Sequence, residues 1–405
     1  MGIRRSIVHI DLDTFFVSCE RLLNPQLIGK PVLIGGVTSR GVVASCSYEA
    51  RRFGISSAMP MRMAQQLCPE AIVIRGDSGL YSKYSHLVTE IIREHAPLYE
   101  KSSIDEFYLD LTGMDHFFGC YKWATELRER IHIETGLPLS MGLSVNKTVS
   151  KVGTNEAKPN GHIQVIAGQE RNFLSPLSLL KIPSVGEKTF AVLREMGLEK
   201  VRTVQNMPKD LLQALLGLPG ANLWNKCQGL DQTPVVPYTE RKSISIERTF
   251  EQDTIDVHKM RSILLAMAEN LAFQLRNGVK LTSCVTVKLR YADMNVYSKQ
   301  KRIPYTACDK TLIGLTRELF QSLYDRRLRV RLVGVRYSHL VCGGQQINFL
   351  TDTEQQCKLY QAMDMLRKRY GQDAVKRAAA MGSRAIGRIN PFNGEPPIIP
   401  AHRRA

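Results

Sequence analysis

No apolar run in this sequence is long enough to cross a membrane, since none reaches the roughly 18 residues that a spanning helix requires. The nine cysteines stand singly, with no Cys-x-x-Cys pair. This argues against a cysteine zinc site and favours a reduced compartment. No period of about 20 to 50 residues recurs, so a solenoid is not expected. We therefore expect a soluble, cytoplasmic protein that has no membrane partner.

Positive charge is what the chain has in excess. Its formal net charge is +17 over 405 residues. A basic excess of this size suggests a polyanionic partner, although a run of like charges taken alone is more often a solvated face. The length permits two or more domains with sizeable cores.

Two acidic stretches lie at the ends of apolar runs. The run 7–16 is β-branched and carries Asp11 and Asp13, while Asp105 and Glu106 begin a second apolar run. Both runs are typical of strands. In a continued strand Asp11 and Asp13 would share a face, whereas Asp105 and Glu106 can act together only if one lies where its strand leaves the preceding serine turn.

Carboxylates of this kind are the hard oxygen ligands that magnesium prefers. Three or four acids can hold two ions roughly 3.5 to 4 Å apart, a spacing that supports an in-line phosphoryl displacement. Any one of these acids taken alone is more simply explained as a cap or turn residue. The spacing does not decide between the two interpretations.

Longer motifs around these acids carry a family resemblance. Asp11-x-Asp13 is followed by Phe15-Phe16, and the second stretch reads Ser103-Ile104-Asp105-Glu106-Phe107-Tyr108-Leu109-Asp110. Both resemble the two signatures of the Y-family translesion DNA polymerases, here of the polymerase IV type, over about residues 5 to 340. The resemblance implies low-fidelity synthesis opposite damaged or misaligned template by two-metal nucleotidyl transfer from deoxynucleoside triphosphates to a primer 3′-hydroxyl. No segment is left for a proofreading domain.

The resemblance also implies an α+β fold in the right-handed polymerase arrangement of palm, fingers and helical thumb, plus a separate α/β little-finger domain. The palm would be a small, antiparallel-rich sheet that carries the acids and is backed by helices. The expected boundaries are palm 1–15 and 76–166, fingers 16–75, thumb with a helix-hairpin-helix 167–230, linker 231–242, little finger 243–342, and a clamp-binding motif, helix and flexible tail over 343–405.

Metal and catalytic roles follow from the resemblance. Asp11, Asp105 and Glu106 would be catalytic and, with the carbonyl of Leu12, would hold two Mg²⁺ ions. Asp13 stays open, because it could either bind metal or orient the strand by hydrogen bonding.

Nucleotide-binding residues also follow from it. They are Phe16, Ser45, Tyr48, Arg51 and Lys158. Tyr48 and Arg51 are three apart, so they share a face on the short helix expected near 47–54. Lys151 and Lys158 are seven apart, about two turns, and should lie on one side of a helix that opens at 146. Gly153-Thr154 replaces the small apolar pair usual in the family, which weakens this helix.

Phe16 is expected to exclude the ribose 2′-hydroxyl of an incoming nucleotide. Phe15 and Phe16 could equally be core aromatics. In an extended segment one would pack inward while the other lines the site. The resemblance assigns the sugar-discriminating role to Phe16.

A helix-hairpin-helix is indicated by residues 180–188, where a tight turn can offer backbone N–H groups to a DNA phosphate. A short connection without a DNA role is an equally simple explanation. Ser184 stands where glycine is commoner, and 218–220 is a weaker second candidate. In the C-terminal half, basic residues alternate with apolar ones along a strand, which predicts one charged face for phosphates. The expected DNA contacts are Lys181, Val185, Gly186, Lys188, Arg241, Lys242, Arg248, Arg329, Arg331 and Arg336.

The segment 346–350 resembles the peptide by which bacterial polymerases bind the sliding clamp, with its last two apolar residues in swapped order. Its expected contact residues are Gln346, Ile347, Phe349 and Leu350. Beyond it, Leu359, Met363, Leu366 and Tyr370 predict a helix with a single apolar seam. The implied partners are primer–template DNA, deoxynucleoside triphosphates and a sliding clamp, with a monomeric polymerase associated with the nucleoid of a bacterial cytoplasm.

Two other classes of protein remain open. A catalytically silent accessory subunit of a lesion-bypass assembly shares this architecture but tends to lose the acids, which are present here. A two-metal nuclease or nucleotidyl cyclase could use similar carboxylates. The basic second domain and the helix-hairpin-helix candidate favour a long DNA ligand over a small one. Primer extension with labelled deoxynucleotides separates the three.

Overall fold

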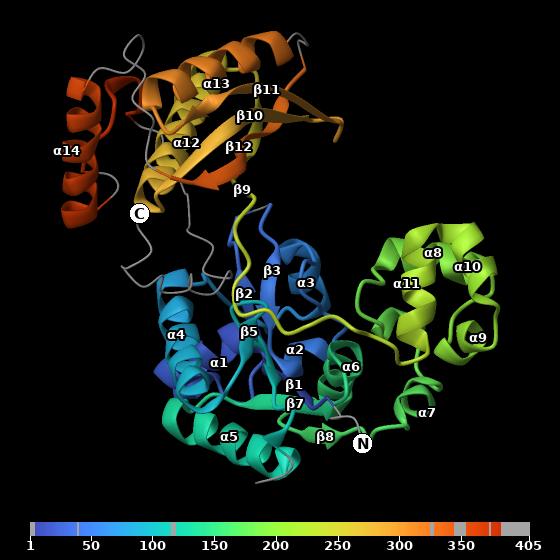
Figure 1. Ribbon diagram of the computed structural model, residues 1–405. Helices are drawn as coiled ribbons and strands as arrows, with labels where there is room; N and C mark the ends of the chain where they lie inside the picture. Colours follow the sequence, from blue (N-terminus) through green and yellow to red (C-terminus); the bar gives the residue numbers. More distant parts are fainter. Residues whose placement is uncertain are drawn as a thin grey trace, which may run out of the picture. The chain divides into compact units, whose positions relative to one another are not determined.

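The structure is a computed structural model that describes residues 5–38, 40–114, 119–324, 328–343, 354–371 and 374–381 (Figure 1). The described residues up to Thr239 form one compact unit, and those from Glu240 onward form a second. In this part of the chain, no helix is both long and apolar enough to span a membrane.

A five-stranded sheet lies at the centre of the first unit, in the order β5-β6-β1-β7-β8. Strand β1 (Ile7–Leu12) pairs antiparallel with β6 (Glu106–Asp110) on one side and with β7 (Leu139–Ser144) on the other. β5 (Tyr99–Lys101) and β8 (His162–Gln164) complete the sheet. Every residue of β1 is buried, as expected for a central strand covered on both faces.

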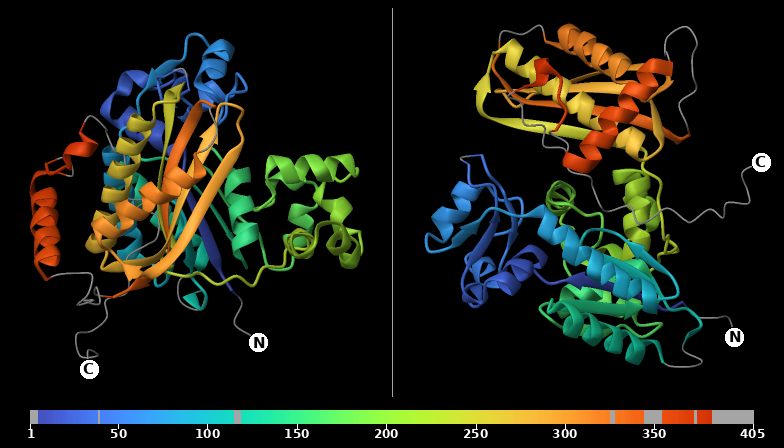
Figure 2. Two further views of the ribbon diagram at one scale, coloured as in Figure 1. Left: turned by 90° about the horizontal axis from the view of Figure 1, so that it is seen from above. Right: turned by 90° about the vertical axis from the view of Figure 1, so that its left-hand side faces the viewer.

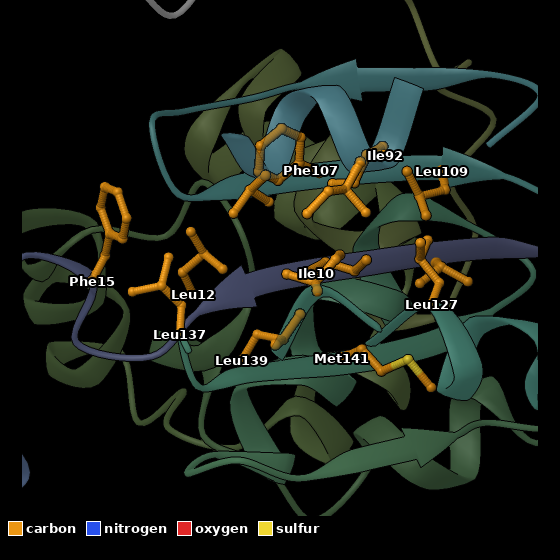
Figure 3. Close-up of a cluster of buried hydrophobic side chains, with 14 of the residues drawn as sticks. Ile10, Leu12, Phe15, Ile92, Phe107, Leu109, Leu127, Leu137, Leu139 and Met141 are labelled. Carbon is orange, nitrogen blue, oxygen red and sulfur yellow. The ribbon is translucent and has the colours of Figure 1, made fainter. Parts of the chain in front are cut away.

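Helices α4 (Ser78–His95) and α5 (Cys120–Thr135) cover one face of this sheet. Ile10 and Leu12 point into the core on that side, as Figure 3 shows together with Ile92 of α4 and Leu127 of α5. Because successive side chains of a strand alternate, His9 and Asp11 point to the other face. That face is covered by α6 (Lys147–Ala157).

Glycines explain how α6 packs so closely on the sheet. A Cβ atom at Gly142 of β7 would lie 2.3 Å from the carbonyl oxygen of Ser150, so only glycine fits there. Thr154 Oγ1 lies 3.0 Å from the His9 carbonyl oxygen, to which it donates. Gly153-Thr154 therefore contributes to the contact between α6 and the sheet, and the helix is continuous through it. The helix ends at Ala157, and Lys158 is extended (φ −66°, ψ 144°). The prediction that Lys151 and Lys158 share a helix face was therefore wrong.

A smaller three-stranded sheet, β3-β2-β4, has its own core within the first unit. It consists of β2 (Val32–Gly35), β3 (Val43–Cys46) and β4 (Ile72–Ile74), with the helices α1 (Phe15–Leu23), α2 (Tyr48–Arg51) and α3 (Met61–Leu67) around it. Ser47 caps α2 by accepting the backbone N–H of Ala50, and the chain turns away at Gly54, whose φ is +79°.

A helical region follows the sheet. Its elements are α7 (Glu170–Leu174), the 3₁₀ turn η3 (Leu179–Lys181), α8 (Glu187–Glu195), α9 (Val201–Gln205), α10 (Lys209–Leu216) and α11 (Leu218–Cys227). They share a core with the α6 residues Val149 and Val152.

The second unit is a four-stranded antiparallel sheet in the order β11-β10-β12-β9. Its strands are β9 (Ser243–Thr254), β10 (Lys280–Tyr291), β11 (Val296–Thr306) and β12 (Val330–Cys342). The helices α12 (Val257–Asn277) and α13 (Asp309–Leu323) pack on one face of it (Figure 2).

Helix α14 (Glu354–Tyr370) contacts the second unit through Tyr360, which is buried, and through charged side chains. Asp364 accepts two hydrogen bonds from Arg276 of α12, at 2.6 and 2.9 Å, and buried Arg367 donates to Glu269 at 3.0 Å. Leu359, Leu366 and Tyr370 are exposed. Three of the four residues of the predicted apolar seam are therefore exposed; Met363 is half-buried, and the aromatic residue that this helix buries is Tyr360, which the prediction did not include.

Candidate active site

Acids from separated parts of the chain meet at one end of the five-stranded sheet. The β1–β6 register places Asp11 directly opposite Glu106, and the backbone N–H of Leu12 donates to the Asp105 carbonyl oxygen at 3.0 Å. Asp105 stands just before β6 begins. This is the position from which it can act beside Glu106, as the sequence analysis required.

A serine fixes this turn. Ser103 Oγ accepts the backbone N–H groups of Asp105 and Glu106 at 3.3 and 3.0 Å, and donates to the Asp105 carboxylate at 2.5 Å. The backbone N–H groups of Ser102 and Ser103 also donate to the Glu106 carbonyl oxygen, at 3.0 and 3.3 Å, so this hydroxyl adds to a turn that the backbone closes.

Lysines balance the charge of these acids. Lys158 Nζ lies 2.7 Å from Asp11 Oδ1, and Lys151 Nζ lies 2.7 and 2.8 Å from the two carboxylate oxygens of Glu106. Although Lys158 lies beyond the helix, the structure brings both lysines to the acids.

Asp11 is buried, Asp105 and Glu106 are half-buried, and the three acids are close enough to affect one another. Burial raises the pKa of Asp11 to about 7; Lys158 opposes the rise, and the charges of Asp105 and Glu106 add to it. Burial also raises the pKa of Asp105, against the hydrogen bond from Ser103 and with the charge of Glu106. Such a cluster favours a bound cation.

The donor set consists of oxygen atoms. Among the described residues, no three His, Cys, Asp or Glu side chains are arranged so that they alone could hold a metal ion. The set is Asp11, Asp105, Glu106 and the neighbouring carbonyl of Leu12. These are hard donors and fit a divalent cation that keeps some of its water and takes its remaining ligands from a substrate phosphate.

Asp13 lies in a turn and not in a continued strand, so the condition under which it would share a face with Asp11 is not met. β1 ends at Leu12, and Thr14 has a positive φ of 43°. The Asp13 carboxylate is buried and accepts hydrogen bonds from three parts of the fold: Tyr48 Oη at 3.0 Å, Ser140 Oγ at 2.8 Å and the backbone N–H of Asn160 at 2.7 Å.

Two of the predicted nucleotide residues lie together on α2. The Arg51 guanidinium lies 4.9 Å from the centre of the Tyr48 ring, so the predicted shared face is confirmed. Burial and the charge of Asp13 raise the pKa of Tyr48. Ser45 lies nearby in the chain, on β3.

Phe15 and Phe16 begin helix α1, so the expected extended backbone was wrong. One ring is nevertheless buried and the other half-buried: Phe15 is 3% exposed, whereas Phe16 stacks on Tyr81 with ring centres 4.2 Å apart. Tyr81 in turn donates to Glu20 at 2.6 Å. Tyr81 was not among the predicted site residues, and no local motif marks it.

The hairpin candidate consists of η3, a turn and α8. Ser184 has a φ of +83°, the conformation for which glycine is the commoner residue. Lys226 Nζ holds the turn by donating to the Pro183 carbonyl and to Ser184 Oγ, at 2.9 and 2.7 Å. Gly186 is the N-cap of α8, so Val185 lies just before the helix and Lys188 lies in its first turn. Lys181 pairs with Glu156 at 2.7 Å. At the second candidate, Gly217 precedes α11 with a φ of +69°.

In the second unit, the predicted basic residues do not form one face along a single strand. Arg331 lies at a register irregularity, and Arg336 lies opposite Thr286 on the face away from the helices. The expected alternation along this strand was therefore wrong. Arg248 lies two residues from Ile246 and two from Phe250, both of which point into the core. Its side chain therefore leaves β9 on the core side and not on the face away from the helices.

Basic side chains from several strands replace that single row. The pairing register of the strands and the alternation of their side chains place four basic residues on the face of the sheet away from the helices: Lys288, Arg290, Arg302 and Arg336. Arg241 and Lys242 lie just before β9, and Arg329 just before β12. The clamp motif at 346–350 lies outside the described residues.

Comparisons with known proteins agree with this architecture. The model described as the impB/mucB/samB family matches residues 10–155, and that of its C-terminal domain matches 241–349. A third model, described as the thumb domain of DNA polymerase-iota, matches 180–231. The chain belongs to the Y family of DNA polymerases, which makes it a DNA-directed translesion polymerase.

Its particular relatives are named DNA polymerase IV. The protein of that name from Dehalococcoides mccartyi (strain ATCC BAA-2100) is 37% identical over 93% of this chain and 97% of its own length. A solved Y-family polymerase chimera of Dbh and Dpo4 is 26% identical, with a TM-score of 0.72 over 84% of this chain and 100% of the other. An insertion ternary complex of Dbh DNA polymerase covers the same shares at a TM-score of 0.62. The predicted α+β palm, fingers, thumb and little-finger fold, the enzyme class and the polymerase IV type are therefore confirmed, and the family implies a divalent metal cofactor.

Proposed function

We propose that Asp11, Asp105 and Glu106, with the carbonyl of Leu12, bind two Mg²⁺ ions at the end of β1 and β6. One observation carries this assignment: strand pairing places Asp11 opposite Glu106 and joins Leu12 to Asp105. When bound, two such ions activate the primer 3′-hydroxyl and stabilise the charge of the departing pyrophosphate.

The protein side chains position the nucleotide and offset its charge. Lys158 and Lys151 carry their ammonium groups to the acids, at the point where a triphosphate would be held. Arg51 adds a third cation from α2. Cations fixed around a transferring phosphoryl group stabilise the charge that develops on it. Tyr48 would help Arg51 to hold the triphosphate, Ser45 would contact the nucleotide, and Phe16 would shape the side of the site that receives the sugar.

The domain boundaries expected from the sequence follow this assignment. We assign the palm to 1–15 and 76–166, the fingers to 16–75, the thumb to 167–230, the linker to 231–242 and the little finger to 243–342. The sheet that bears the acids, the three-stranded sheet, the helical region and the second unit support these limits.

The second unit would bind primer–template through the basic face defined by Lys288, Arg290, Arg302 and Arg336. The thumb hairpin would add phosphate contacts from Val185 and Gly186, with Lys181 and Lys188 beside it. Cationic side chains on one face of a sheet can bind the phosphates along a DNA backbone without contacting the bases.

A salt titration tests this face. We expect binding of primer–template to weaken with salt at a slope of about −0.9 per phosphate neutralised, and Arg302→Ala or Arg336→Ala to reduce the slope by about one. The matched control is Lys301→Ala, which removes the same charge from the next residue. Lys301 faces the helices, where its Nζ pairs with Glu318 at 2.9 Å. A control that changes the slope as much as Arg302→Ala would contradict the proposed face.

A sliding clamp is the further partner that we propose, through Gln346, Ile347, Phe349 and Leu350. Deleting 346–350 should leave distributive synthesis intact and remove stimulation by the clamp; equal stimulation after deletion would exclude the motif. A monomeric enzyme in a bacterial cytoplasm, associated with the nucleoid when active, completes the proposal.

Primer extension tests the function directly. The wild-type protein should add labelled deoxynucleotides to a recessed primer in a template-directed manner and should require Mg²⁺. Binding without extension would favour an accessory subunit, and shortening of the primer would favour a nuclease. Either outcome would count against the proposed mechanism.

A further inference from the structure

Asp13 joins three parts of the fold through one carboxylate. Tyr48 Oη, from α2, lies 3.0 Å from Oδ1. Ser140 Oγ, from β7, lies 2.8 Å from Oδ2, and the backbone N–H of Asn160 lies 2.7 Å from the same oxygen. Because Asp13 is only 1% exposed, this carboxylate is a buried acceptor, and each of its oxygens is used by the protein itself.

The hydrogen bond to Asn160 fixes the turn that follows Lys158. Asn160 has a φ of +49°, and Arg128 Nη2 donates to its carbonyl oxygen at 2.7 Å. The Gly161 N–H donates to Ser140 Oγ at 3.3 Å, so the same serine contacts both Asp13 and the turn. The turn is therefore held from both sides, two residues after the lysine whose ammonium group reaches Asp11.

The hydrogen bond to Tyr48 ties the same carboxylate to helix α2. The Tyr48 hydroxyl donates its one proton to Asp13, and the Tyr48 ring carries the Arg51 guanidinium 4.9 Å from its centre. The orientation of Asp13 therefore influences Tyr48 directly and Arg51 through Tyr48.

We infer that Asp13 is a positioning residue for the incoming triphosphate. It fixes Tyr48 and the turn after Lys158 relative to one another and is not a ligand of the catalytic metal. The inference rests on the proposed function, because it takes Tyr48, Arg51 and Lys158 as the groups that receive the triphosphate. It resolves the alternative that the sequence left open for this acid.

Two substitutions at Asp13 separate positioning from metal binding. In Asp13→Asn the amide oxygen can still accept from Asn160 and Ser140, and the Tyr48 hydroxyl can accept from the new NH₂ group instead of donating. In Asp13→Ala all three donors lose their partner, and of the three the Ser140 hydroxyl stays buried. We expect Asp13→Ala to raise the KM for deoxynucleotide at least about tenfold, because neither Tyr48 nor the turn after Lys158 is then held in place. Asp13→Asn should recover to within about threefold, and the Mg²⁺ concentration for half-maximal rate should stay at its wild-type value in both variants.

A double-mutant cycle tests the link to Tyr48. In a Tyr48→Phe background, Asp13→Ala should raise KM by a smaller factor than in the wild type, because one of the three bonds is already absent. Ser140→Ala tests a second arm of the network: it removes another donor to Asp13, leaves the bond to Tyr48 intact and should raise KM by less than Asp13→Ala does. Circular dichroism melting on each variant shows that it is folded. If Asp13→Ala does not fold, Asp13→Asn and Ser140→Ala still carry the test.

Two outcomes would overturn the inference. One is an Asp13→Asn variant that loses kcat at unchanged KM and needs more Mg²⁺, because this is the behaviour of a metal ligand. The other is an Asp13→Ala variant with wild-type KM. Failure of the proposed function is distinguishable from both, because the wild-type protein itself would then fail to extend a primer.

Discussion

Glu106→Ala is expected to abolish primer extension while leaving primer–template affinity within about threefold of wild type. Glu106 lies opposite Asp11 in the β1–β6 pair, with Lys151 Nζ at 2.7 Å. Its removal would delete a carboxylate from a buried site that depends on fixed negative charge to hold divalent ions. Electrostatic groups at such centres are commonly worth at least about 10² to 10³ in kcat, and a shared metal ligand should exceed that range. Asp105→Ala should behave in the same way.

Glu100 offers a matched control for this experiment. It lies on β5 of the same sheet and pairs with Lys147 of α6 at 2.7 Å, much as Glu106 pairs with Lys151. Glu100→Ala therefore removes a similar half-buried ion pair without touching the candidate metal ligands, and extension should persist. Single-turnover extension and fluorescence anisotropy of labelled primer–template give the two readouts. Retained extension in Glu106→Ala, or equal losses in both variants, would exclude the assigned site.

Phe16→Ala is expected to admit ribonucleotides. The Phe16 ring is half-buried and held flat against Tyr81, with an angle of 11° between the planes. A ring fixed in this way cannot move aside for a 2′-hydroxyl without losing its stacking contact. Alanine would remove the obstacle. The ratio of kcat/KM for a deoxynucleotide to that for its ribonucleotide should fall about 10²-fold, roughly 3 kcal/mol of discrimination.

Phe15 is the natural comparison for Phe16, because it is the adjacent residue and is buried in the core. Phe15→Leu should lower the free energy of unfolding by about 1 kcal/mol through lost packing and leave sugar selectivity unchanged. Steady-state incorporation of matched deoxy- and ribonucleotides measures both variants. Unchanged selectivity in Phe16→Ala would move the discriminating residue elsewhere.

Motifs along the chain predicted the position of the acids well. The apolar runs around Asp11 and Glu106 made both strands predictable. The parity of a strand required Asp105 to lie in the preceding turn, where the structure places it. Local patterns also predicted the helix that begins after Asn146 and the face shared by Tyr48 and Arg51.

The features that could not be predicted depend on distant residues. The partners of Asp13 on β7 and in the following turn are 127 and 147 positions away in sequence. No local pattern shows that Lys158 leaves its helix yet still reaches Asp11. The exposure of Leu359, Leu366 and Tyr370 on α14 has the same cause, since the face that this helix buries is set by contacts with another helix, such as the pair between Asp364 and Arg276.

A crystal structure with primer–template, a non-hydrolysable deoxynucleoside triphosphate and Mn²⁺ tests the central claim most directly. We expect two anomalous peaks bounded by the carboxylates of Asp11, Asp105 and Glu106. Lys158 and Arg51 should contact the phosphates, and Asp13 should still accept hydrogen bonds from Ser140 and Asn160. Anomalous peaks away from these carboxylates, with a triphosphate bound elsewhere, would contradict it.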